Sequence, residues 1–231
     1  MTLSDTLDEH RVLVGRYAWW SAWVGLVVGQ LHALARYRTA DGAGDLDNPL
    51  TRAWAEPAGR ALRPLLDWAD PDVVYFAYGK IWLPVFLGFF LCALLVRRDR
   101  QPVAFEKWAW RVVLVGYGWA VLGVAGDYWL QWGHGNAALL DITFLATLPA
   151  LLITLVGSSV LGVALLRKGL RPRSAAWLLA GTFPAALLLM SITSQGSAAL
   201  PVMFAFGILG RSMAREREDL LPQEILRRRL A

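Results

Sequence analysis

Long apolar blocks, separated by short charged stretches, limit more than any other feature what this chain can fold into. They span residues 17–37, 74–96, 109–130, 142–166, 175–193 and 198–213. A helix needs roughly 20 apolar residues to cross a bilayer, and the first five blocks are long enough. The sixth is short and contains Pro201, so we expect it to tilt or to lie partly inside the bundle. The pattern predicts an all-α, polytopic membrane bundle of about six transmembrane helices.

The composition favours a membrane protein. Of the 231 residues, 56% are hydrophobic and 18% are charged, whereas soluble domains have about 45–50% and about 25%. The formal net charge of +5 needs no nucleic acid to explain it, because the basic residues follow membrane topology. The single cysteine, Cys92, excludes an internal disulfide and a cysteine-based metal cluster. We therefore expect neither a metal site nor a nucleic-acid partner.

Basic residues are strongly biased to one side of the predicted bundle. Of the 23 Lys and Arg residues, 17 fall in the N-terminal segment, the connections around 97–111 and 167–173, and the tail. Since Lys and Arg accumulate in cytoplasmic loops, we predict that both termini are cytoplasmic in a bacterial plasma (inner) membrane. We divide the chain into a single transmembrane bundle domain, 1–213, and a cytoplasmic basic amphipathic tail, 214–231.

The long outer connection, residues 38–73, has the signals of a helix of its own. Asp47 and Asn48 are candidate N-caps, and Pro49 would take the first helical position. Apolar residues then recur at helical spacing. Two prolines should break or kink this helix, Pro57 and Pro64. We predict one or two short amphipathic helices that lie on the outer leaflet or fold over the mouth of the bundle as a cap.

Small residues lead to a charged residue on one face of two predicted spans. The first span carries the GxxxG sequence Gly25–Gly29, followed on the same face by His32 or Ala33 and by Arg36. The third span has the same arrangement in Gly116, Ala120, Gly123 and Asp127. Because small residues let helix backbones approach closely, we expect both faces to point into the bundle rather than toward lipid.

Charged groups at membrane depth are costly, so they should find one another. We predict that Arg36 pairs with Asp127 and that Lys80 lies near Asp72 or Asp141. The candidate ligand-binding residues of an outward-facing polar pocket are His32, Arg36, Tyr75, Tyr78, Lys80, Asp127, Tyr128, His134 and Asp141. Its walls would be tryptophans, namely Trp82, Trp129 and Trp132. The alternative is that these residues only fix the register of the helices.

Most catalytic motifs are absent from the sequence, and catalytic residues stay unknown. The sequence contains no P-loop, HExxH or GxSxG. The serines of GSSVLG, residues 157–162, fit small-residue helix packing better than nucleophilic catalysis. We expect no cofactor, although His32 and His134 on different helices are the pair that could ligate a haem.

The segments LLRKGLRPRSAAWLLAG (165–181) and GDYWL (126–130) resemble parts of uncharacterised multi-pass membrane proteins of actinobacterial type. The resemblance covers the C-terminal half of the chain. It implies an all-helical plasma-membrane protein and carries no activity or site residues.

Three function hypotheses remain open at this point. The first is a binding or accessory protein whose outer pocket holds a membrane lipid or small amphiphile, or which docks on a protein partner or forms a homo-oligomer. The second is an integral-membrane enzyme that acts on a lipid-soluble substrate, with His32 and Asp127 as an acid/base pair. The third is a small transporter built from helical hairpins, which the lack of charge at mid-depth disfavours.

Overall fold

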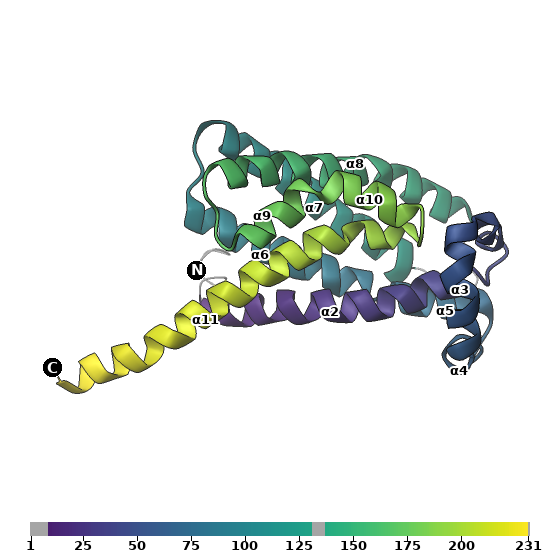
Figure 1. Cartoon of the computed structure of the whole chain (residues 1–231), viewed down its shortest axis with the longest axis horizontal. Coiled ribbons are helices and arrows are strands. Elements are labelled where there is room, and N and C mark those ends of the chain that lie inside the picture. Colours follow the sequence, from purple (N-terminus) through teal and green to yellow (C-terminus); the bar gives the residue numbers. More distant parts are fainter. Residues whose placement is uncertain (1–8, 131–136, 231) are drawn as a thin grey trace.

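The computed structural model describes residues 9–130 and 137–230, and these contain helices and no strand. In Figure 1 the long helices run along the bundle, and two short helices cross one end of it. The α-helices are α2 (Arg11–Arg36), α3 (Pro49–Ala61), α4 (Arg63–Leu66), α5 (Pro71–Gly79), α6 (Trp82–Arg100), α7 (Ala104–Val124), α8 (Ala137–Arg167), α9 (Arg173–Ala180), α10 (Thr182–Met190) and α11 (Leu200–Leu230). Short turns of other helix types are η1 (Ala43–Asp47), η2 (Ala125–Trp129) and η3 (Gln195–Ala199).

Five helical stretches are long and apolar enough to cross a membrane, and the count is six if α9 and α10 together form one broken span. This is the pattern of a multi-pass membrane protein. The five stretches are Arg11–Arg36, Pro71–Arg100, Ala104–Trp129, Leu145–Arg167 and Gly196–Glu216. The last block is part of the 21-residue stretch Gly196–Glu216, and 67% of its most apolar window is buried, as expected for a helix that lies partly inside the bundle.

The fifth block forms two helices, α9 and α10, which meet at an angle of 58°. Pro184 has no N–H, so it cannot continue the backbone ladder of α9 through the break. The backbone N–H of Phe183 donates instead to Ser159 Oγ on α8, at 2.9 Å. Within a membrane such a break requires another group to satisfy the freed backbone, and Ser159 supplies it.

Small residues set the closest contacts between helices, as predicted. A Cβ added at Gly25 would lie 2.7 Å from Val85 Cγ2 of α6, and one at Gly116 would lie 2.5 Å from Ile153 Cγ2 of α8. Helices α2 and α11 lie side by side in Figure 1. They approach until a Cβ on Gly210 would lie 2.7 Å from the carbonyl oxygen of Gly15. The prediction that these small faces point into the bundle is confirmed.

The serine run of α8 also serves packing. Ser158 Oγ lies 2.7 Å from the hydroxyl of Tyr117, and both side chains are fully buried. Around this pair the bundle core is aromatic: the Tyr117 ring packs edge-to-face against Phe89 and Phe206, at centroid distances of 5.0 and 5.8 Å. The ring contacts join α6, α7 and α11, and the contact between Ser158 and Tyr117 joins α8 to α7, as a packing role for the serine predicts.

The long connection forms a cap, residues 43–66, that contains η1, α3 and α4 and packs on one end of the bundle (Figure 1). Asn48 is the N-cap, since its Oδ1 accepts from Leu50 N at 2.9 Å, and Pro49 is the first residue of α3, as predicted. Two hydrogen bonds of 2.7 Å tie the cap to the end of α10, from Asn48 Nδ2 to the Ser191 carbonyl and from Trp54 Nε1 to the Ile192 carbonyl. In the structure this connection therefore contacts the end of the bundle.

Of the two prolines predicted to break or kink the helix of the outer connection, Pro64 does so and Pro57 does not: α3 ends at Ala61, and Pro64 lies in the first turn of α4. Pro57 lies inside α3 without ending it. The carbonyl that would have accepted its N–H belongs to Ala53, which is exposed to solvent, so the lost bond leaves no buried group unsatisfied. Helix α11 runs on from the bundle to Leu230 (Figure 1), so the predicted tail continues the last span as helix over residues 214–230.

Candidate functional site

Aromatic and polar side chains from four elements meet at the capped end of the bundle. The imidazole of His32 on α2 stacks on the ring of Tyr75 from α5, with centroids 4.5 Å apart. The ring of Tyr128 in η2 lies edge-on to it at 5.2 Å. The hydroxyls of Tyr75 and Tyr128 are 3.2 Å apart. The structure thus brings three of the predicted site residues together, from helices that the sequence alone does not order in space.

His32 is built into this cluster rather than presented to a ligand. It is 2% exposed, and its Nδ1 accepts a hydrogen bond from Trp82 Nε1 at 3.2 Å. Its Nε2 is buried and has no hydrogen-bond partner in the part of the chain that the structure describes. Stacking and one hydrogen bond therefore hold the ring, which favours a packing role for His32.

Arg36 has a different ion-pair partner from the one predicted. Its Nε lies 2.9 Å from Asp45 Oδ2 in η1, and not against Asp127. The chain turns sharply after α2: the hydroxyl of Thr39 donates to the Arg36 carbonyl at 2.7 Å and accepts from Gly42 N at 3.1 Å. Because of this turn, η1 lies beside the end of α2. The carboxylate that pairs with Arg36 therefore belongs to a residue only nine positions later in the chain.

Two more of the predicted residues, Lys80 and Tyr78, make contacts at this end of the bundle. Lys80 Nζ is 5.7 Å from the centroid of the Trp129 ring, and Trp129 Nε1 donates to the Lys80 carbonyl at 3.0 Å. The hydroxyl of Tyr78 donates to the Leu65 carbonyl of the cap at 2.7 Å. Outside the described residues lie His134, Trp132 and the side chain of Asp141.

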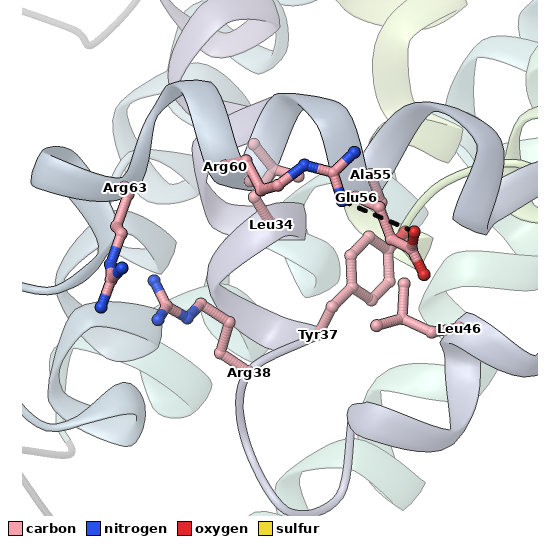
Figure 2. A pocket seen from close by; sticks show the side chains of 9 residues that line it. Leu34, Tyr37, Arg38, Leu46, Ala55, Glu56, Arg60 and Arg63 are labelled. Atoms are coloured by element: carbon pink, nitrogen blue, oxygen red, sulfur yellow. Dashed lines mark ion pairs between the residues drawn. The ribbon is translucent and has the colours of Figure 1, made fainter.

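A cavity of about 330 Å³ opens between the cap and the end of α2. Figure 2 shows Tyr37 and Arg38, from the turn after α2, facing the side chains of α3 and α4. The cavity is lined by Leu34, Tyr37, Arg38, Leu46, Ala55, Glu56, Gly59, Arg60 and Arg63. None of the predicted site residues whose side chains are described is among them. This cavity is therefore a different one from the pocket that the sequence predicted.

The charged side chains of the cavity are arranged in ion pairs. Arg60 Nη1 lies 3.8 Å from Glu56 Oε2, the pair drawn in Figure 2. Arg38 and Arg63 both pair with Asp67, which follows α4, and the Arg63 Nε to Asp67 Oδ2 distance is 2.7 Å. Three arginines and one glutamate thus line a cavity whose other walls are mainly apolar. Sequence reasoning counted these arginines only as markers of topology.

Asp67 lies outside the membrane-spanning stretches, and its ionisation reports on the two arginines. Hydrogen bonds from Arg63 and Arg38 lower the pKa of the Asp67 carboxyl below its ordinary value. Because the folded pKa is lowered, the pairs are intact above the ordinary pKa of an aspartate and are lost as the pH falls through the lowered value. We expect NMR titration of the Asp67 carboxyl to give a midpoint below the ordinary value, and R38Q/R63Q to raise it. An unchanged midpoint in that variant would contradict the pairing.

The described side chains limit the chemistry of this site. Within residues 9–130 and 137–230, the His, Cys, Asp and Glu side chains that the structure describes form no group of three that could hold a metal ion. Guanidinium groups above an apolar floor can bind an anion that carries an apolar part.

A scan of protein-family models, a search of curated proteins and a search of solved structures find no match to this chain.

Proposed function

We propose that this chain is an integral-membrane binding protein whose cap cavity holds the anionic headgroup of a lipid or small amphiphile. The observation that carries the proposal is the cavity itself, with Arg38, Arg60 and Arg63 around an apolar surface. Ligand sites are concave and mostly apolar, with a few placed polar groups that fix orientation. A volume of about 330 Å³ lies at the small end of the range for such sites, so it suits a headgroup and its first carbons.

The position of the cavity supports a ligand taken from the membrane surface. It lies where α2, a candidate span, ends and the cap begins. An amphiphile at that depth could keep its chain among lipids while its headgroup reaches the arginines. The bias of basic residues toward the opposite end supports an outer position for this cavity in a bacterial plasma membrane, with both termini cytoplasmic.

Native mass spectrometry of protein in lipid nanodiscs tests the proposal. We expect the wild type to retain phosphatidic acid or phosphatidylglycerol in preference to phosphatidylcholine, and R60Q/R63Q to lower that retention about fivefold, since each exposed ion pair contributes up to about 1 kcal/mol. Arg60 and Arg63 are 74% and 76% exposed, so the double variant should fold.

The matched control is R173Q/R215Q, which removes two exposed arginines from the opposite end of the bundle. It changes the net charge by the same amount and should leave lipid retention unchanged. Equal retention by the wild type and R60Q/R63Q, or equal loss in both double variants, would contradict a site at the cap.

A further inference from the structure

Resting on the proposed function, we infer that Asp67 competes with the ligand's anionic group for Arg38 and Arg63, and that the cavity therefore selects amphiphiles that end in a phosphate monoester. Two cavity-lining arginines, Arg38 and Arg63, converge on this one carboxylate, which does not itself line the cavity. An anion that enters the cavity must replace Asp67 as the ion-pair partner of the two arginines. This competition decides which headgroups can bind.

The geometry around Asp67 resembles the recognition of an oxyanion. Its Oδ1 pairs with Arg38 and its Oδ2 with Arg63, so each oxygen is engaged by an arginine from a different element. Figure 2 shows the guanidinium groups of Arg38 and Arg63 side by side at one edge of the cavity. Asp67 is 30% exposed, so water reaches the pair and an exchange of anions needs no unfolding of the cap.

The chemistry of the exchange favours a headgroup with more charge and more acceptor oxygens than a carboxylate. A phosphate monoester carries about −1.5 to −2 charges at pH 7 and offers three strong acceptor oxygens. A phosphodiester or a carboxylate carries a single charge and gains little by replacing Asp67. The resident carboxylate thus disfavours singly charged lipids.

The test compares phosphatidic acid, a monoester, with phosphatidylglycerol, a diester, at equal mole fraction in phosphatidylcholine nanodiscs, using native mass spectrometry. We expect the wild type to retain phosphatidic acid about fivefold better. In D67N the retention of phosphatidylglycerol should rise about threefold and the preference should fall accordingly. The control D47N removes a carboxylate of the same cap that is 91% exposed and lies outside the cavity, and it should keep the preference.

The outcomes separate this inference from the proposed function. Retention of both anionic lipids with no preference, unchanged in D67N, would overturn the role of Asp67 and leave the lipid site intact. Retention of neither lipid would overturn the proposed function itself. If D67N loses thermal stability in detergent, D67E and R38Q/R63Q replace it: the first should keep the monoester preference and the second should abolish it. The reverse pattern would overturn the inference.

Discussion

Alanine at Gly210 is expected to lower the free energy of unfolding by about 1–3 kcal/mol, because the added Cβ would collide with the backbone of α2. It would lie 2.7 Å from the Gly15 carbonyl oxygen and 2.9 Å from Gly15 Cα. A flexible side chain could rotate away from such a contact, but backbone cannot, so α2 and α11 would have to separate along their length. Within the described part of the chain these two helices pack against each other more extensively than any other pair, so a shift there affects many other contacts.

Denaturant or thermal unfolding in a mild detergent measures this effect, with G118A as the matched control. Gly118 is also inside a helix, but a Cβ there would lie 3.6 Å from Phe90 Cζ, an ordinary contact. Alanine favours a helix by up to about 1 kcal/mol over glycine, so G118A should be neutral or stabilising. Equal stability of G210A and G118A would contradict the close crossing of α2 and α11.

The arrangement of spans could be predicted largely from the sequence, because long apolar runs and small-residue spacings are local signals. The effect of each proline depends on its place in a helix, which the apolar pattern does not give. Pro201 is the second residue of α11, where no N–H is needed, so it does not interrupt the helix. Pro184 stands four residues after Ala180, inside a span that had already begun, and there the missing N–H breaks the helix.

The candidate site could be predicted only in part, since it depends on how the cap folds back. The sequence pattern indicated Arg36 and Lys80 as site residues because a charged side chain at membrane depth costs free energy. The arginines that line the cavity lie in a connection, where charge is ordinary and carries no such signal. One local signal was available: Glu56 with Arg60, and Arg63 with Asp67, are four residues apart and can pair along a helix. These pairs meet Arg38 because of the turn after α2, and the spacing of the residues in the sequence does not predict that contact.

The end of the bundle opposite the cap depends on Glu106, and E106Q should cost about 2 kcal/mol of unfolding free energy. This carboxylate is 3% exposed at the start of α7. Its Oε1 accepts from Arg100 Nε at 2.9 Å and from Trp110 Nε1 at 3.2 Å, and its Oε2 lies 3.2 Å from Lys168 Nζ. Glutamine keeps the size but has one acceptor oxygen, so its NH₂ group would face a donor.

The expected cost is smaller than the loss of about 3–5 kcal/mol that is typical when one partner of a fully buried ion pair is removed. Arg100 and Lys168 are 22% and 43% exposed, so water can solvate both cations once the carboxylate is gone. A double-mutant cycle with K168M separates the ion pair from the other two contacts, and its coupling should account for less than half of the loss. E216Q, which removes an exposed carboxylate on α11, is the control and should be neutral within about 0.5 kcal/mol. If E106Q were equally neutral, Glu106 would not join α6, α7 and the end of α8, and the apolar core alone would hold that end of the bundle.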